Sequence, residues 1–393
     1  MRISYRAQKL KPSATMKVAA MAKNMMTKGI DVVNFGVGEP DFNTPQHIKE
    51  AGIKAINDNF TRYTKAPGID ELRAVISNKL KTDNSLNYSP EQIIVSPGAK
   101  ASLFYALFAV CSKGDKVLIP SPYWVTYPPQ VELCDATPII IQTKEKNGFK
   151  LTASEMKEVI KKEGKIKLLI LNSPSNPTGS VYTKDELFAI AELCLKNNIL
   201  VLSDEIYEKL IYDGAEHYSI ATHSSEMKEK TILVNGVSKS FAMTGWRMGY
   251  TAAASDIIAK MGSIQSQLSS NVNSITQMAC LKAIGTKTDD VENMRVQFEK
   301  RKDFMVKELT NIENVSCTTP QGAFYAFPNI SSFLGKSIKN DVDFCTFMLE
   351  KFFIALVPGS AFGADSYVRF SYANSMENLK KGIDRFKEGL SSI

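Results

Sequence analysis

Five short apolar runs, each bounded by polar or turn-forming residues, recur through the middle of the chain. They span residues 93–95, 117–119, 168–171, 199–202 and 231–234. Stretches with apolar residues at helical spacing lie between them, for example 184–197. Short apolar runs are typical of strands buried on both faces, and their alternation with helices is typical of parallel sheets. The pattern predicts an α/β fold with a mostly parallel sheet flanked by helices.

The character of the chain changes after Gly285. A charged helical stretch comes first, then a turn-rich segment at 319–325, and a closing strand and helix within 368–390. A chain of 393 residues is also longer than one hydrophobic core usually organises. We therefore predict a large domain at 43–285 and a smaller α+β domain at 286–393, completed by an N-terminal arm at 1–42.

Composition argues against several functional classes. The formal charge of +7 comes from 48 Lys and Arg against 41 Asp and Glu, and the basic residues are scattered, which does not favour nucleic-acid binding. Six widely spaced cysteines and three histidines suggest reduced thiols and no metal site. No apolar stretch of about 18 residues occurs, so we expect no membrane span or export signal. A cytoplasmic protein is predicted.

Polar or glycine-bearing turns follow the predicted strands directly. They occupy residues 96–100, 120–124, 172–179, 203–207 and 235–239. Ligands of open α/β sheets bind outside the carboxyl ends of the strands. Functional side chains are therefore expected in these five turns.

The turn at 96–100 contains Gly98, Ala99 and Lys100 and opens an apolar helix. Free backbone N–H groups at a helix start, with a glycine that permits close approach, can bind an anion. An ordinary strand-to-helix turn is the alternative, because one glycine alone is a weak signal.

Lys239 follows the last of the five runs and lies among small and apolar residues, with Arg247 eight positions later. A lysine in a desolvated cleft near other cations loses proton affinity and becomes an amine nucleophile. The alternative is an ordinary solvated lysine on the surface.

Four other residues are candidates for ligand contacts. Asp204 and Tyr207 follow one strand and together could bind a ring nitrogen and a ring oxygen, although a surface acid or helix cap is the commoner role for such an aspartate. Arg369 interrupts an apolar strand and could bind a carboxylate bidentately, or form a structural salt bridge. Trp124 could stack on a planar ring or belong to the core.

Taken together, these motifs resemble the class I aminotransferases of pyridoxal-phosphate (PLP) fold type I, and within them the bacterial and plant aspartate aminotransferase branch. The resemblance covers nearly the whole chain. Its motifs are residues 11–15, 36–42, 176–179, 203–207 and 239–250, together with Arg369. The run around Lys239 is the most specific of them.

The resemblance implies a role for each matching residue. Lys239 would form the Schiff base with PLP and carry the proton, while Asp204 would pair with the pyridine nitrogen. Groups that would contact the PLP ring or phosphate are Gly98, Ala99, Lys100, Trp124, Asn176, Tyr207, Ser238, Arg247 and, from a second subunit, Tyr63. Groups that would contact the substrate are Arg369, Gly38, Asn176, Trp124, Lys100 and Thr15. A homodimer with shared active sites is also implied.

Two positions depart from familiar relatives. Gly236 stands where many of them carry a phosphate-binding hydroxyl, so Ser238 or fewer contacts must serve. No arginine occurs in 265–273, the stretch that supplies a partner-subunit arginine for the side-chain carboxylate in better-known aspartate enzymes. The resembled branch instead uses a lysine at the position of Lys100, helped by hydroxyl and amide groups of that stretch.

The resulting hypothesis is an aspartate:2-oxoglutarate aminotransferase that works by a ping-pong cycle. Lys100 with Thr15 also points to prephenate as a second acceptor. The alternatives are an aminotransferase for aromatic, alanine or methionine substrates, a PLP-dependent C–S lyase, and a non-catalytic sensor of the same fold.

Overall fold

The structure is a computed structural model that describes residues 3–4, 7–8, 10, 14–335 and 337–393, with the side chains of 14–17 outside that description. Its centre is a seven-stranded sheet in the order β2-β8-β7-β6-β5-β3-β4. The strands are β2 Ile93–Ser96, β3 Lys116–Ser121, β4 Thr137–Gln142, β5 Leu168–Asn172, β6 Leu200–Asp204, β7 Thr231–Gly236 and β8 Gly249–Ala252. All five predicted strands are present, and the mostly parallel sheet is confirmed.

Two strands of this sheet were not predicted, for different physical reasons. The side chains of β4 are mostly exposed or half-buried, because β4 lies at the edge of the sheet. Strand β8 is short and pairs antiparallel with both β2 and β7. Because β8 runs back beside β7, the connection 237–248 stays at the carboxyl edge of the sheet, and this connection carries Lys239 and Arg247.

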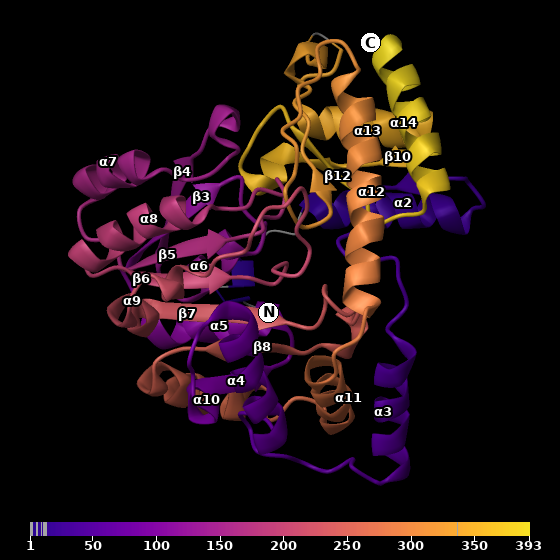
Figure 1. The fold of residues 1–393 in the computed structure, drawn as a ribbon. Helices are drawn as coiled ribbons and strands as arrows, with labels where there is room; N and C mark the ends of the chain where they lie inside the picture. Colours follow the sequence, from indigo (N-terminus) through magenta and orange to yellow (C-terminus); the bar gives the residue numbers. More distant parts are fainter. Residues whose placement is uncertain (1–2, 5–6, 9, 11–13, 336) are drawn as a thin grey trace.

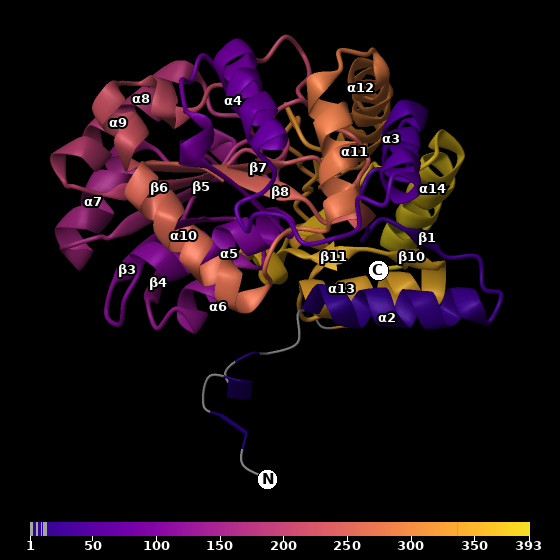
Figure 2. The ribbon, with the colours of Figure 1, turned by 90° about the horizontal axis from the view of Figure 1, so that it is seen from below.

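Helices cover both faces of the sheet (Figure 2). Helices α5 Ala99–Val110, α6 Tyr127–Leu133 and α10 Ser255–Leu268 pack on one face. The other face carries α4 Asp70–Asn84, α7 Ala153–Glu163, α8 Lys184–Lys196, α9 Ser225–Lys230 and α11 Ser274–Gly285, and α3 Gln46–Asn57 packs on α11. Alternate residues of each strand enter the two cores, as for Leu168 and Leu169 of β5, which explains the unbroken apolar runs.

The smaller domain contains residues from both ends of the chain (Figure 1). Its elements are α12 Asp290–Thr310, β9 Tyr325–Ala326, α13 Asp341–Phe352, β10 Ile354–Ala355, β11 Val357–Pro358, β12 Val368–Ser371 and α14 Met376–Ser391. From the N-terminal part, β1 Val33–Asn34 pairs with β10, and α2 Ala14–Thr27 contacts β10, β11 and α13. The expected α+β domain formed by both termini is confirmed, while its boundaries after residues 42 and 285 stay predictions.

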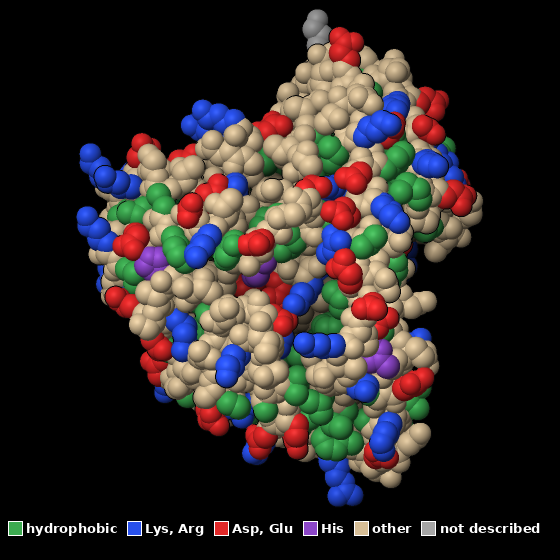
Figure 3. Space-filling model, viewed as in Figure 1, with side chains coloured by type: hydrophobic (Ala, Val, Ile, Leu, Met, Phe, Trp, Pro, Cys, Tyr) green, Lys and Arg blue, Asp and Glu red, His purple; other side chains and the backbone are tan. Residues whose placement is uncertain are grey.

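Short 3₁₀ turns connect several of these elements. They span Pro90–Gln92, Glu145–Asn147, Ile220–Thr222, Thr244–Trp246, Ser331–Phe333 and Gly359–Phe362. The six cysteines form no disulfide. Among the described residues, no helix combines the length and apolar character needed to cross a membrane. Figure 3 shows Lys and Arg side chains interspersed with Asp and Glu over one face of the molecule.

Gly249 allows the start of α5 to lie against β8. A Cβ atom at Gly249 would lie 2.3 Å from the backbone nitrogen of Ala99. We expect Gly249→Ala to destabilise the large domain by about 1–3 kcal/mol, because backbone atoms cannot yield as a flexible side chain can. The measurement is urea unfolding followed by tryptophan fluorescence, since Trp124 and Trp246 both lie in this domain.

Gly262, within α10, provides the matched control. A Cβ atom there would meet nothing within 4 Å, so Gly262→Ala should stabilise the protein by about 0.5–1 kcal/mol. Equal stability of the two variants would contradict the close packing at Gly249.

Candidate active site

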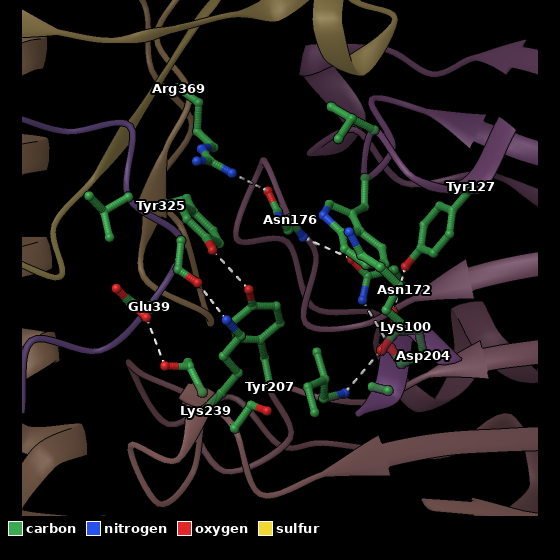
Figure 4. Close-up of a pocket in the computed structure, with 18 of the residues that line it drawn as sticks. Glu39, Lys100, Tyr127, Asn172, Asn176, Asp204, Tyr207, Lys239, Tyr325 and Arg369 are labelled. Atoms are coloured by element: carbon green, nitrogen blue, oxygen red, sulfur yellow. Dashed lines mark hydrogen bonds between the residues drawn. The ribbon is translucent and has the colours of Figure 1, made fainter. Parts of the chain in front are cut away.

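A pocket of about 440 Å³ opens at the carboxyl ends of the central strands, facing β9 and β12 of the smaller domain (Figure 4). It is lined by residues from all five predicted turns and from both domains. Of the residues singled out from the sequence, it brings together Gly38, Ala99, Lys100, Trp124, Asn176, Asp204, Tyr207, Ser238, Lys239, Arg247 and Arg369. Among these residues the pocket gathers one acid, four cations and two aromatic side chains, which lie far apart in the sequence.

Asp204 ends β6 and has only 3% of its surface exposed. Tyr127 donates a hydrogen bond of 2.7 Å from its hydroxyl to Oδ2, and the backbone N–H of Ile206 donates to Oδ1 at 3.3 Å. Burial raises the pKa of Asp204 to about 6, although these two donors and the charge of Lys239 act in the opposite direction. No cation among the described residues forms an ion pair with Asp204. A protonated nitrogen placed in the pocket would provide that missing positive charge.

A chain of hydrogen bonds connects Asp204 with Arg369 across the pocket (Figure 4). The side-chain amide of Asn172 donates to the backbone oxygen of Asp204 at 3.0 Å. Asn172 Oδ1 accepts from the backbone N–H of Asn176 at 2.9 Å, and Asn176 Oδ1 accepts from Arg369 Nη1 at 3.0 Å. These hydrogen bonds fix the positions of Asp204 and Arg369 relative to each other.

Lys239 lies beyond the end of β7, partly buried, with its amine donating to the backbone oxygen of Gly38. Burial lowers the pKa of Lys239 to about 8, and the guanidinium groups of Arg369 and Arg247 act in the same direction. Near pH 8, Lys239 is therefore a neutral amine in a substantial fraction of the protein molecules. This is the state in which lysine attacks a carbonyl group.

The start of α5 forms a cationic corner of the pocket. Gly98 precedes the helix with φ +89°, and a Cβ atom at Gly98 would lie 2.6 Å from Arg247 Nη2. The absence of a side chain thus lets the guanidinium lie against the helix N-terminus. Free N–H groups and a positive charge together favour a phosphate or another anion at this corner.

Arg369 is 5% exposed and forms no salt bridge with any described residue. Its Nη2 donates to the backbone oxygen of Gly36 at 2.9 Å, while Nε is buried without a partner. The guanidinium also lies over the ring of Tyr325, 4.4 Å from its centroid. The structural salt bridge considered from the sequence is therefore absent among the described residues. A carboxylate ligand would compensate this buried charge.

Some sequence-predicted residues lie elsewhere. Tyr63 is 91% exposed and does not line the pocket of its own chain. Gly98 lies against Arg247 and does not line the pocket either. Thr15 belongs to α2, and its side chain is outside the described part. Residues 265–273 do not line the pocket either. A side chain at Gly236 would meet the backbone oxygen of Met248 at 2.9 Å, so no hydroxyl fits there, while Ser238 does line the pocket.

Several lining residues were not predicted from the sequence. They are Tyr127, Asn172, Tyr325, Phe362, Glu39 and Thr244. Asn172 could have been found, because it is the first residue of the predicted turn at 172–179, although no role was assigned to it. Tyr325 could not, since its hydroxyl reaches Tyr207 at 2.8 Å only after the smaller domain packs on the sheet.

A second group of titratable residues, Glu205, Glu208 and His217, lies behind Asp204 with its ligand atoms within 4.8 Å of one another. Glu205 accepts from the hydroxyls of Ser203 and Ser219 and contacts His217 Nε2 at 2.9 Å. Glu208 forms an ion pair with Lys79. The ammonium of Lys79 thus already provides positive charge at this cluster.

The raised pKa of Asp204 predicts a stability difference that depends on pH. The unfolded chain releases this proton near pH 4 and the folded chain near pH 6, so folding loses stability as pH rises through that window. Asp204→Asn removes the buried charge but retains an oxygen for Tyr127. In the cofactor-free protein, Asp204→Asn should have a higher free energy of unfolding than wild type. This difference should be about 2 kcal/mol larger at pH 7.5 than at pH 4.5.

Urea denaturation at fixed protein concentration measures this difference, with Asp256→Asn at the start of α10 as the control. A pH-independent difference, or an equal one in the control, would show that Asp204 is not a buried, unpaired carboxylate.

Comparison with known proteins agrees with this geometry. Residues 30–386 match the family model described as aminotransferase class I and II. The chain is 45% identical over 384 residues to a protein of Bacillus sp. (strain YM-2) named aspartate aminotransferase, which covers 98% of this chain and 97% of that protein. It is 44% identical over 393 residues to a protein of Aquifex aeolicus (strain VF5) named probable aspartate/prephenate aminotransferase, with 100% and 99% covered.

A solved structure shows the same fold. The aspartate aminotransferase of Thermus thermophilus with maleate aligns with a TM-score of 0.92 and 38% sequence identity, covering 99% of this chain and 100% of that one. The match confirms fold type I. With a pocket that combines a buried acid, a desolvated lysine and a cationic helix start, and with relatives over its whole length, the chain belongs to the class I and II aminotransferases.

Proposed function

We propose that this protein is a PLP-dependent aspartate aminotransferase that transfers the amino group of L-aspartate to 2-oxoglutarate by a ping-pong cycle. The observation that carries the proposal is that Lys239 shares the lining of one pocket with two cations, Arg369 and Lys100, that can each bind one carboxylate. The names of the relatives from Bacillus and Aquifex support the same substrate.

The residues present fit PLP. Asp204 is a buried carboxylate that forms no ion pair with any described residue, so it can bind the protonated pyridine nitrogen. Arg247 lies against the start of α5, where a phosphate would bind. Trp124 offers a ring face and Tyr207 a hydroxyl, both in the wall of the pocket. Lys239 is partly neutral, as covalent attachment requires.

Bound PLP would supply an electron-withdrawing ring that accepts the electron pair left when the Cα–H bond of the amino acid breaks. The protein groups do the rest. Arg369 and Asn176 bind the α-carboxylate and thereby orient Cα toward Lys239. Lys239 Nζ takes the Cα proton and holds it in the pocket. Asp204 keeps the ring nitrogen protonated, and the aromatic walls limit the access of water.

Lys100 is the group that selects a second carboxylate. Its ammonium lies 4.8 Å from the centroid of the Trp124 ring. Burial, helped by the charge of Arg247, lowers the pKa of Lys100 below that of an ordinary lysine. A bound carboxylate offsets both effects, so Lys100 favours aspartate and glutamate over neutral amino acids. Prephenate also carries two carboxylates, and we propose it as a second acceptor, with Thr15 contributing.

We also propose a cytoplasmic homodimer. The large exposed side chains Ile53, Ile56 and Tyr63 lie close together in sequence and need a covering surface. A second copy would provide it and would bring its own Tyr63 to the phosphate. The six unpaired cysteines suit a reducing compartment.

The direct test adds L-aspartate to the PLP-loaded protein and records the absorbance of the cofactor. Conversion to the amino form, reversed by 2-oxoglutarate, is the expected result. Lys239→Ala should lower the rate of conversion roughly 10⁴-fold or more, because the group that moves the proton is lost. Release of pyruvate from cystathionine without amino transfer would indicate a C–S lyase instead.

Replacing Lys100 should affect the kinetics with dicarboxylate substrates but not those with aromatic substrates. Lys100→Met should raise the KM for aspartate by roughly 10- to 100-fold, since one charge-assisted hydrogen bond is lost, and leave the kinetics with phenylalanine nearly unchanged. Lys113→Met, an exposed lysine beyond α5, is the matched control. Equal losses with both donors would contradict the assignment of Lys100.

A further inference from the structure

Glu39 is the second acid of the pocket and has no part in the function proposed above. The charged side chains that line the pocket are Lys100, Lys239, Arg247 and Arg369, with Asp204 and Glu39 as acids. Asp204 is buried and bonded to Tyr127. Glu39 is exposed, in the segment that joins β1 to α3.

The carboxylate of Glu39 is fixed by the loop that follows Lys239. Thr244 Oγ1 donates to Glu39 Oε2 at 2.7 Å, and a dashed line marks this hydrogen bond at Glu39 in Figure 4. The backbone oxygen of the same threonine accepts from Arg247 Nη1 at 2.9 Å. Thr244 therefore connects Glu39 to the cationic corner of the pocket.

Residues 36–39, which we call the strap, also contact two of the other cations. The backbone oxygen of Gly36 accepts from Arg369 Nη2 at 2.9 Å. The backbone oxygen of Gly38 accepts from the amine of Lys239. The strap is thus held at three points, and Glu39 is its one charged residue.

The groups around the Lys239 amine come from several elements. Glu39 of the strap and Asp204 of β6 favour the ammonium form, and Glu39 does so more strongly. Burial opposes both, as do Arg369 of β12 and Arg247 of the 237–248 loop. The ring centroids of Tyr207 and Phe324 lie 5.8 Å and 5.7 Å from Nζ.

We propose that Glu39 is a positioning residue for Lys239: anchored by Thr244, it holds the strap against the amine and provides the negative charge that keeps an ammonium there. The assignment rests on the proposed function and deepens it. A proton taken from Cα must remain on Lys239 Nζ until it is transferred onward, and the charge of Asp204 is then engaged by the ring nitrogen. Glu39 is the remaining acid in the lining of the pocket.

Three variants separate charge from anchoring. Glu39→Gln keeps an oxygen for Thr244 but removes the charge, while Thr244→Val keeps the charge but removes its anchor. Asp41→Asn is the matched control, because Asp41 is a carboxylate of the same connection that pairs with Arg301 at 2.6 Å and does not line the pocket.

The readout is the pH dependence of acetylation of Lys239 by acetic anhydride in the full-length, cofactor-free protein, measured by mass spectrometry of the peptide that contains it. Loss of a nearby negative charge makes the ammonium less stable, so its pKa falls. Glu39→Gln should move the midpoint of acetylation to lower pH by roughly half a unit or more, Thr244→Val should move it less in the same direction, and Asp41→Asn should not move it.

An unchanged midpoint in Glu39→Gln, or an equal shift in Asp41→Asn, would overturn the assignment. A shifted midpoint in a chain that transfers no amino group would leave the assignment standing and refute the proposed function. In active enzyme, the pH profile of kcat should shift with the acetylation midpoint while the KM for aspartate stays within about twofold.

Discussion

The site depends on the burial of charges that form no ion pair with any described residue. Asp204 has a raised pKa, Lys239 has a lowered one, and Arg369 is buried with no acid of the described part of the chain paired to it. Each of these charges is unfavourable in the free protein and becomes favourable when a ligand of opposite charge binds. The same unfavourable burial therefore specifies what the pocket can bind: a protonated ring nitrogen, a carbonyl group and carboxylates.

The topology of the sheet places these charges together. Parallel strands β5, β6 and β7 bring Asn172, Asp204 and the start of the Lys239 loop to one edge. The antiparallel β8 returns the chain to the same edge, which brings Arg247 to the start of α5. Packing of the smaller domain adds Arg369 and Tyr325 from the opposite side. The position of each functional group thus follows from an ordinary feature of α/β folding.

Much of this arrangement could be predicted from the sequence, because strands buried on both faces appear as apolar runs and their ends mark the ligand edge. Lys239 and Asp204 are predicted in this way, whereas the role of Asn176 comes from the resemblance to the aminotransferases. The partners that set their properties were not, since the hydroxyl of Tyr127, the hydroxyl of Tyr325 and the carboxylate of Glu39 reach the pocket through tertiary contacts that no local pattern encodes. The contributions of Tyr63 and Thr15 stay predictions, because both depend on groups beyond the described pocket.

In the proposed reaction, this pocket moves an amino group from a dicarboxylic amino acid to a dicarboxylic oxo acid. The most direct measurement incubates the PLP-loaded protein with ¹⁵N-labelled L-aspartate and unlabelled 2-oxoglutarate and follows the label by NMR. We predict ¹⁵N-glutamate and an equal amount of oxaloacetate. Label that stays in aspartate, or that appears as free ammonium, would contradict it.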